Sequence, residues 1–342
     1  MKLSVIVPVY NMAEGDRLKH CLDSLLGQSL KDMEIIAVDD ASTDSSPDIL
    51  KEYEGRLNAI RPGALKIILS KENHRQGGAR NRGMELADGE WIGFMDSDDY
   101  ADPLMFEKLI RCAEETGADV CGCDYELVSF YGDKNGKPVA NNTIEQTGVL
   151  DDDKHKSLIL RGGSSVTKIY RASLIKDNEL SFPEDIFYED NCAAPLWSMY
   201  FKNFAYVPEP LYKYLTVQSS TTHTVSVEKC RDRMEAGRIF ILECKKRDLY
   251  ERYKEEIDYR FTELSYVTTL FSYMYSGRGR KPSFTAEIKR YIREILPDFL
   301  DNKYLSEYTD KENLSFIKLQ QKSNILFFIK YVLLFKYREL RK

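Results

Sequence analysis

Three carboxylates lie within four positions, directly after a short apolar run that is typical of a buried strand. They are Asp96, Asp98 and Asp99. Like charges this close repel by about 4 kcal/mol at an effective dielectric constant of about 20, so the cluster needs water, protons or a cation around it. Because carboxylates offer only oxygen ligands, the cation they favour is Mg²⁺ or Mn²⁺. The alternative is an acidic turn that caps a helix starting at Asp102-Pro103.

A second acidic stretch, residues 182–191, contains two carboxylate pairs, Glu184-Asp185 and Glu189-Asp190. A carboxylate at the start of a helix accepts hydrogen bonds from free N–H groups and stays ionised, as a general base must. The apolar pattern of a helix follows the second pair directly, which favours Glu189-Asp190 for that role. The first pair is the competing choice, and helix capping is the alternative role for Asp190.

Strands and helices alternate in the part of the chain that must position these carboxylates. Buried strands are predicted over Leu3–Val9, Met33–Val38, Lys66–Ser70 and Trp91–Met95. Helices are predicted between them over Asp16–Leu30, 47–60 and 79–87. This alternation predicts an α/β fold with a mostly parallel central sheet and helices on both faces.

Polar residues follow the ends of these strands. They are Tyr10-Asn11, Asp39-Asp40, Asn73 and Asp96–Asp99. Ligands of parallel sheets bind at the carboxyl ends of the strands, so we expect a nucleotide site here. The sequence has neither a G-x-G-x-x-G nor a G-x-x-x-x-G-K-[ST] pattern, which disfavours dinucleotide binding and a P-loop. A metal held by Asp96 and Asp98, together with a cation such as Arg80, must therefore bind the phosphates.

Four segments match a known family in their order and spacing. They are Ser4–Asn11, Val38–Asp44, Gly78–Asn81 and Met95–Asp99. On these segments, residues 1–100 resemble the nucleotide-sugar half of family 2 glycosyltransferases, which have the GT-A fold. The family usually has glycine where Ala41 stands, a mild departure. The resemblance implies a metal-dependent, inverting transfer of a sugar from a nucleotide diphosphate sugar, with UDP as the expected nucleotide, to an acceptor hydroxyl.

The resemblance also implies which residues bind the nucleotide. Pro8 and Tyr10 would flank the uracil ring. Asp40 would accept its N3–H, with Asp39 alongside, and Asn73 would approach the base. Plainer alternatives exist, because Tyr10 could be a core aromatic and the two aspartates could cap a turn or a helix.

The remaining donor-site residues belong, by resemblance, to the diphosphate, the sugar and the metal. Arg80 would approach the diphosphate, and Asp96 would reach the ribose or the sugar, with Ser97 beside it. Asp98 would ligate Mn²⁺ or Mg²⁺ directly, with Asp96 as a second ligand. His223, in a polar loop after the last predicted strand, would contact phosphate or metal, and an ordinary surface histidine is its alternative.

The same resemblance makes Asp190 the general base and has Glu189 orient it or shape the acceptor pocket. The base removes the proton of an acceptor hydroxyl as its oxygen attacks the anomeric carbon. The acceptor implied is a bacterial cell-surface glycan, a teichoic acid or a lipid-linked oligosaccharide. Two other classes fit the residues: a metal-dependent nucleotidyltransferase, which releases pyrophosphate, and a non-catalytic, membrane-associated module that binds nucleotide sugars.

Three regions are expected along the chain. Residues 1–100 form the nucleotide-sugar half of a GT-A domain, and residues 101–226 form its acceptor-binding and catalytic half. The second half is predicted to contain a helix over Asp102–Thr116 and strands over Ala118–Tyr131, Ser165–Tyr170 and Val207–Leu215. Residues 227–342 form a helical region, with helices predicted over 228–247, 250–275, 284–295 and 310–340.

The composition is that of a globular protein, with 43% hydrophobic and 30% charged residues, and the net charge of −6 gives no reason to expect nucleic acid as a partner. Seven cysteines are scattered without metal-binding spacing, which predicts reduced thiols and a cytosolic domain. The first residues do not have the pattern of a signal peptide.

The C-terminal tail, residues 323–342, combines an apolar segment with a basic end. Ile325–Phe335 is apolar except at Lys330, but it is shorter than the about 20 residues of a membrane span. Residues 330–342 carry five basic side chains and one acidic side chain, a net charge of +4. Such a segment suits the anionic inner face of a cell membrane. The alternative is that it packs on the protein's own helices or on a second subunit.

Overall fold

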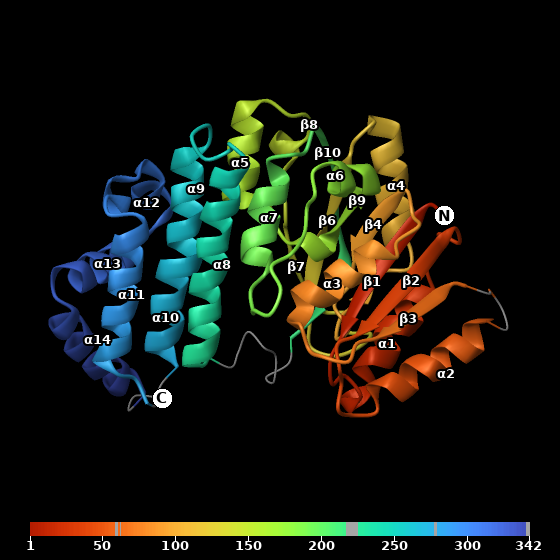
Figure 1. Cartoon of the computed structure of the whole chain (residues 1–342), viewed down its shortest axis with the longest axis horizontal. Coiled ribbons are helices and arrows are strands. Elements are labelled where there is room, and N and C mark those ends of the chain that lie inside the picture. The colour runs from red at the N-terminus through yellow and green to blue at the C-terminus, as the bar shows by residue number, and fades with distance from the viewer. Residues whose placement is uncertain (59–60, 62, 217–224, 277–278, 340–342) are drawn as a thin grey trace. The chain divides into compact units, whose positions relative to one another are not determined.

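The computed structural model describes the chain of 342 residues except 59–60, 62, 217–224, 277–278 and 340–342. The chain forms two compact units, Met1–Gln218 and Ser219–Lys342. The first unit is an α/β domain built on one sheet, and the described part of the second consists of helices (Figure 1).

The sheet of the first unit has ten described strands in the order β3-β2-β1-β4-β9-β6-β10-β5, with β7 paired to β6 and β8 paired to β10. The strands are β1 (Leu3–Val9), β2 (Met33–Asp39), β3 (Leu65–Leu69), β4 (Trp91–Phe94), β5 (Tyr100–Ala101), β6 (Val120–Val128), β7 (Lys137–Val139), β8 (Gly148–Val149), β9 (Lys168–Arg171) and β10 (Asn203–Leu215). A single sheet thus runs through both predicted halves of the domain.

The longer strands mostly point in one direction. β1 runs parallel to β2 and β4, and β2 runs parallel to β3. β9 is antiparallel to both β4 and β6, so β6 regains the direction of β4, and β10 runs parallel to β6. The carboxyl ends of β1, β2, β4, β6 and β10 therefore lie along the same edge of the sheet. The prediction of a mostly parallel sheet is confirmed.

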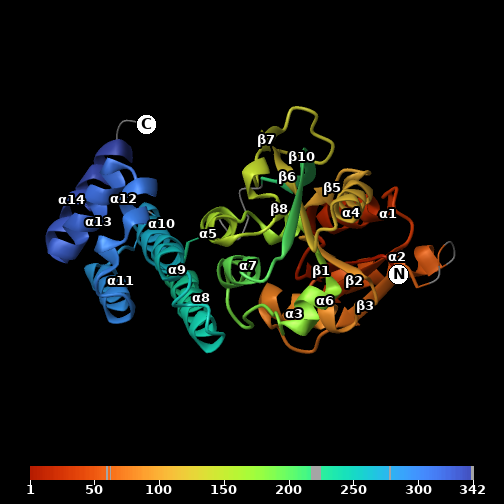
Figure 2. The same ribbon diagram turned by 90° about the horizontal axis from the view of Figure 1, so that it is seen from above.

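Helices cover both faces of this sheet. They are α1 (Arg17–Leu26), α2 (Ser46–Asn58), α3 (Arg75–Glu85), α4 (Met105–Thr116), α5 (Asp152–Arg161), α6 (Ala172–Asp177) and α7 (Asp190–Ser198). Successive residues of β4 face opposite ways, since Gly93 faces Phe106 of α4 whereas the Phe94 ring lies 6.1 Å from Trp197 of α7. Figure 2 shows α1 and α4 on one side of the sheet, and α3, α6 and α7 on the other.

This covering explains the apolar runs in the sequence. All seven residues of β1 and all seven of β2 are buried, because each strand has a neighbour on both sides and helices above and below. A strand buried on both faces does not alternate between polar and apolar residues. The continuous apolar pattern of β1 and β2 therefore indicates that both strands lie in the centre of the sheet.

The start of α3 differs from the prediction. The helix begins at Arg75, four residues before the predicted 79, and it includes Gly77 and Gly78. These glycines indicated a loop, but Gly77 serves close packing: a Cβ atom there would lie 1.9 Å from the carbonyl oxygen of Pro183. The missing side chain lets the second acidic stretch approach α3.

The second unit contains α8 (Val227–Lys246), α9 (Lys254–Phe261), α10 (Thr268–Tyr275), α11 (Pro282–Ile295), α12 (Lys303–Tyr308), α13 (Lys311–Lys322) and α14 (Asn324–Glu339). A π-helical turn, Thr262–Val267, joins α9 to α10. The predicted single helix over 310–340 is wrong, because Ser323 is extended (φ −150°, ψ 106°) and separates α13 from α14. Among the described residues, no helix has both the length and the apolar character needed to cross a membrane.

Candidate functional site

The carboxyl end of β2 places two aspartates predicted to bind the nucleotide base. Both carboxylate oxygens of Asp40 accept the backbone N–H of His74, at 3.0 and 3.1 Å, and burial raises the pKa of Asp40. The side-chain amide of Asn73 donates to the Asp40 carbonyl oxygen at 2.9 Å. Asp39 Oδ2 accepts the N–H of Ser42 at 3.1 Å, whereas its buried Oδ1 has no hydrogen-bond partner within the described part of the chain. Asp39 Oδ1 therefore keeps its full capacity to accept a hydrogen bond.

The loop after β1 lies beside these aspartates. Tyr10 is 43% exposed, so it is not the core aromatic of the alternative interpretation, while Pro8 is buried within β1. The N–H of Asn11 donates to Ser42 Oγ at 2.9 Å, which joins the loop after β1 to the loop after β2. In that second loop Ala41 has φ +60°. This left-handed conformation suits glycine better than alanine, which explains the residue usual at this position in the family.

Arg80, on α3, joins the two acidic stretches. Its Nη2 donates to Asp96 Oδ1 at 2.8 Å, and its Nη1 donates to Glu189 Oε1. The guanidinium group is 3% exposed and lies over the Phe182 ring at 5.2 Å. Burial opposes its charge, but the carboxylates of Glu189, Asp96 and Asp190 outweigh burial and raise the pKa of Arg80 above its ordinary value. Arg80 is thus a permanent cation that holds two carboxylates together.

The acidic turn separates its three carboxylates into different environments. Asp96 binds Arg80, as described above. Asp99 is buried, accepts the hydroxyl of Tyr212 at 2.6 Å and the N–H of Leu215 at 2.8 Å, and burial together with the charge of Asp98 raises its pKa. Asp98 is half-buried, and burial followed by the charge of Asp96 raises its pKa to about 6. Of the three, Asp98 is the carboxylate best placed to bind a ligand.

Capping of the next helix does not account for this turn. Asp102, not the acidic turn, accepts the N–H of Leu104 at 2.9 Å just before α4 begins at Met105. Of the three carboxylates before it, Asp96 binds Arg80, Asp99 binds Tyr212, and Asp98 is half-buried. The alternative role of the cluster as a helix cap is therefore wrong.

A divalent cation fits the oxygen atoms of the turn. Asp98 offers a carboxylate whose raised pKa reflects burial beside a like charge, which a cation would relieve. Asp96 binds Arg80 through one oxygen and keeps the other. Among the described residues, no three His, Cys, Asp or Glu side chains form a metal-binding group, so substrate oxygens and water would complete the shell, as is usual for Mg²⁺. The predicted ligand His223 lies outside the described residues.

The second acidic stretch divides into the two pairs seen in the sequence. Glu184 accepts the side-chain amide of Asn81 at 2.8 Å, and Asp185 lies 2.9 Å from His74 Nδ1. Both acids of this first pair are thus bound to residues at and beside α3.

Glu189 and Asp190 lie at the start of α7. Glu189 is buried against Arg80, whereas Asp190, the first residue of the helix, is exposed to solvent. Surrounding protein nevertheless raises the pKa of both carboxyls, and the charge of Arg80 opposes that rise. Asp190 is therefore an exposed residue whose carboxyl is close enough to Arg80 and Asp96 to be affected by their charges, and its neighbour is held in place by an ion pair.

Two contributors to this site were not among the predicted site residues. Tyr212 of β10 donates to Asp99, and its hydroxyl oxygen accepts the N–H of Asp96 at 3.3 Å, so it holds the acidic turn at two points. Phe182 packs against Arg80. Tyr212 lies within a predicted strand and Phe182 at the start of the acidic stretch, but no local pattern indicates contacts across such distances in the sequence.

Comparison with known proteins gives consistent matches. The profile of the family described as "Glycosyl transferase family 2" matches residues 4–177. The putative glycosyltransferase EpsH of Bacillus subtilis is 30% identical over 288 residues, covering 81% of this chain and 79% of that protein. The poly(ribitol-phosphate) β-N-acetylglucosaminyltransferase TarS of Staphylococcus aureus is 29% identical over 261 residues, covering 75% of this chain but only 43% of TarS.

Solved structures share the fold. The crystal structure of TarS residues 1–349 with UDP-GlcNAc covers 94% of this chain and 92% of that one, with a TM-score of 0.67 and 22% identity. The mannosyltransferase PcManGT of Pyrobaculum calidifontis, solved with GDP-Man and Mn²⁺, covers 97% of this chain and 87% of that one, with a TM-score of 0.50 and 15% identity. The expected GT-A fold is thereby confirmed.

Proposed function

The chain belongs to glycosyl transferase family 2 and is a glycosyltransferase, and on this premise we propose that it transfers a sugar from a UDP-sugar to a hydroxyl group of a bacterial cell-surface glycan. The observation that carries the proposal is the bridge through Arg80. It connects the acidic turn, where a donor diphosphate would bind, to the pair Glu189-Asp190, where a general base would act.

Support for a UDP-sugar comes from two sources. TarS has been solved with UDP and with UDP-GlcNAc. In this chain, the exposed ring of Tyr10 and the acceptor oxygens of Asp39 and Asp40 lie at the ends of adjacent strands. A uracil ring needs a flat surface and an acceptor for its N3–H, and these residues offer both. Pro8 and Asn73 complete the proposed base site.

We assign the metal to Asp98, with Asp96 beside it, and Ser97 to the sugar side of the same turn. PcManGT, which shares the fold, was solved with Mn²⁺. When bound, a divalent cation stabilises the negative charge that develops on the departing diphosphate. Arg80 keeps Asp96 in position for this site, and we assign it to the diphosphate as well. His223, which lies outside the described residues, is assigned to phosphate or metal.

Asp190 is the proposed general base. Its carboxylate takes the proton of the acceptor hydroxyl, the hydroxyl oxygen forms a bond to the anomeric carbon, and the bond from that carbon to the diphosphate breaks, releasing UDP. A single displacement of this kind inverts the anomeric configuration. Glu189, paired with Arg80, orients the start of α7 and so positions its neighbour.

The proposed function is tested by release of UDP. We expect Mn²⁺ to increase thermal stabilisation of the protein by at least one UDP-sugar, and the same sugar nucleotide to release UDP when Mn²⁺ is present. A nucleotidyltransferase would instead release pyrophosphate from a nucleoside triphosphate, and a non-catalytic module would bind the UDP-sugar without turnover. Either of those results would contradict the proposal.

We further propose that the protein works in the cytosol, at the inner face of the membrane. All seven cysteines are free thiols, as expected in a reducing compartment. On α14 the aliphatic side chains of Ile325, Leu326, Ile329 and Leu333 are 51–68% exposed. We call these four residues the α14 stripe. A glycan acceptor carried on lipid would be presented at this surface.

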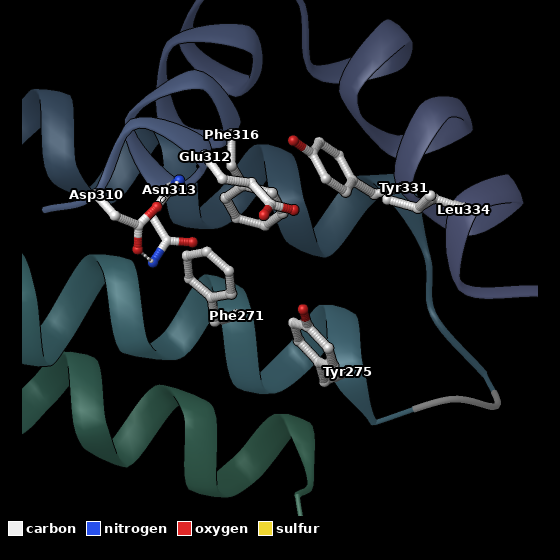
Figure 3. Close-up of a pocket in the computed structure, with 8 residues that line it drawn as sticks. All are labelled: Phe271, Tyr275, Asp310, Glu312, Asn313, Phe316, Tyr331 and Leu334. Carbon is white, nitrogen blue, oxygen red and sulfur yellow. Dashed lines mark hydrogen bonds between the residues drawn. The ribbon is translucent and has the colours of Figure 1, made fainter. Parts of the chain in front are cut away.

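The opposite side of α14 packs inward. Phe327 is buried, and Tyr331 packs against Phe316 of α13 with ring centroids 4.4 Å apart. Tyr331 and Leu334 also line a pocket of about 190 Å³ that faces Phe271 and Tyr275 of α10, as Figure 3 shows. The α14 stripe is thus the side of the helix that no neighbour covers within the described part of the chain. Exposed Lys322 and Lys330 beside it favour an anionic lipid surface over a second copy of the chain.

A further inference from the structure

A pocket of about 430 Å³ lies in the first unit at the ends of β6 and β10. Its volume falls within the range of about 300–1,000 Å³ that is usual for small-molecule sites. Tyr125 of β6, together with Tyr212 and Tyr214 of β10, forms one part of its wall. Asn141, Ser164 and Thr167 form a polar part.

The direction of the strands places this pocket on the ligand-binding edge of the sheet. β6 and β10 have the direction of β1, β2 and β4, so their carboxyl ends share an edge with the aspartates of the proposed donor site. The pocket residues Tyr125 and Tyr214 lie in the carboxyl-terminal halves of their strands. In sheets of this type ligands bind along that edge.

Tyr212 connects the pocket to the acidic turn. Tyr212 is fully buried and lines the pocket, and its hydroxyl donates to Asp99 at 2.6 Å and accepts the N–H of Asp96 at 3.3 Å. A ligand in the pocket would therefore lie one side chain away from the turn proposed to bind the donor. A molecule that receives the sugar must lie next to the donor site, and the link through Tyr212 meets that requirement.

The chemistry of the wall favours a neutral ligand with both apolar and polar surfaces. None of the described residues that line the pocket carries a charged side chain. Lys168 is not among the lining residues: it is 3% exposed, and its side-chain Nζ donates to the Ser164 carbonyl oxygen at 2.7 Å. A pyranose ring presents C–H groups on its faces and hydroxyl groups at its rim, which match aromatic rings and hydrogen-bonding groups, respectively.

The polar part of the wall is already ordered. Asn141 Nδ2 donates to Thr167 Oγ1 at 2.5 Å, and its Oδ1 accepts the N–H of Ser164 at 2.9 Å. Thr167 Oγ1 donates in turn to the Ser164 carbonyl oxygen at 2.9 Å. Groups held in place before binding cost less to order when a ligand arrives.

From these observations we propose that the pocket is an acceptor subsite that binds a neutral pyranose ring of the glycan. The role of the pocket as an acceptor subsite rests on the proposed function, whereas its binding of a pyranose rests on the pocket alone. A charged polyol phosphate would not find a cationic side chain on this wall, so the pocket favours a pyranoside over such a unit.

The experiment measures binding without turnover. The full chain, saturated with UDP and Mg²⁺, is studied by saturation-transfer NMR with methyl β-D-glucopyranoside as the neutral probe and ribitol 5-phosphate as the charged one. We expect saturation transfer to the pyranoside, and a decrease of about tenfold in its affinity in Tyr125→Ala. The matched control is Tyr131→Ala, which removes a tyrosine that is 45% exposed and outside the pocket wall, and should leave binding unchanged.

A second variant, Leu127→Trp, fills the pocket instead of enlarging it and should also abolish pyranoside binding, so the test does not depend on one substitution. Thermal stabilisation by UDP confirms that each variant is folded. The proposal is overturned if the pyranoside does not bind, if it binds the folded variants as well as the original chain, or if ribitol phosphate binds better. If UDP-sugar turnover fails while the pyranoside result holds, the proposed function fails and the sugar site remains.

Discussion

Arg80 shows how a buried charge can organise a site. A guanidinium group that is 3% exposed is stable only when it is paired, and Asp96 and Glu189 provide its partners. The pairing has a structural consequence, because it fixes the acidic turn and the start of α7 at one distance from each other. Asp190, an exposed residue at the start of that helix, is then positioned through its neighbour.

Replacement of Asp190 by asparagine tests the proposed base. We expect Asp190→Asn to decrease UDP release from the best UDP-sugar by about 100-fold or more, because an amide cannot take the proton of the hydroxyl. Binding of UDP, measured by calorimetry, should be unchanged.

Glu184→Gln is the matched control for that variant, since Glu184 belongs to the competing acidic pair and is bound to Asn81. It should retain turnover. Full activity in Asp190→Asn, or a loss in Glu184→Gln alone, would move the base to the other pair.

Lys168 gives the stability of the protein a definite pH dependence. Burial lowers the pKa of its ammonium group from 10.5 to about 7 in the folded chain. Between these two values the unfolded chain binds a proton that the folded chain does not, so the free energy of unfolding rises with pH across this window. In Lys168→Met, the free energy of unfolding should lack the increase with pH that Lys168 contributes. Urea unfolding at several pH values between about 7 and 10 measures it, and equal pH slopes in both proteins would contradict the account.

At the scale of elements, the packing of α3 determines the site. This helix carries Arg80 and lies against the second acidic stretch, and Gly77 permits the close approach because it has no Cβ atom. The same helix binds Glu184 through Asn81. A single helix thus binds both the second acidic stretch and the acidic turn, through Asn81 and Arg80.

Replacement of Gly77 by alanine tests this packing. A Cβ atom 1.9 Å from the Pro183 carbonyl oxygen must displace the backbone, so we expect Gly77→Ala to destabilise the fold by about 1–3 kcal/mol and to lower turnover. Gly55→Ala on α2 is the control, because nothing lies within 4 Å of its added Cβ. Alanine at that exposed helical position should stabilise the protein by about 0.5–1 kcal/mol. Similar effects of the two variants in chemical denaturation would show that α3 is not closely packed at Gly77.

At the scale of the whole molecule, the two units carry different tasks in our proposal. The first holds the chemistry, and the second presents the α14 stripe. Substituting charge into the stripe should affect the location of the protein without affecting its chemistry.

We expect the double variant Ile329→Glu/Leu333→Glu to lose flotation with vesicles that contain phosphatidylglycerol, while UDP release in solution is unchanged. Anionic lipid should matter, because vesicles of phosphatidylcholine alone lack attraction for the basic residues of the tail. Leu242→Glu, at a position of α8 that is 48% exposed, is the control and should still float. If sedimentation shows a dimer that the double variant dissociates, the stripe is a subunit interface and the membrane proposal is wrong.

Much of the fold could be predicted from the sequence because its signals are local. Strands such as β1 and β2 are buried on both faces, and their continuous apolar runs in the sequence indicate this burial. Since parallel strands share their carboxyl edge, the polar residues after them were expected at one site, and the aspartates after β2 and β4 lie along that edge. The apolar pattern predicts only where a site lies. The roles of the donor-site residues and of the base were predicted from the family resemblance.

Only the tertiary structure shows that residues of the same type, such as the aspartates of the acidic turn, have different partners. The three aspartates of the turn look alike in the sequence, but Arg80 binds Asp96, Tyr212 binds Asp99, and Asp98 is half-buried with a raised pKa. The sequence pattern also predicts a loop at Gly77, where the close approach of Pro183 instead requires a glycine within a helix. Local patterns record which residues are apolar and how they repeat, whereas these contacts join atoms far apart in the chain, and only the packed structure brings them together.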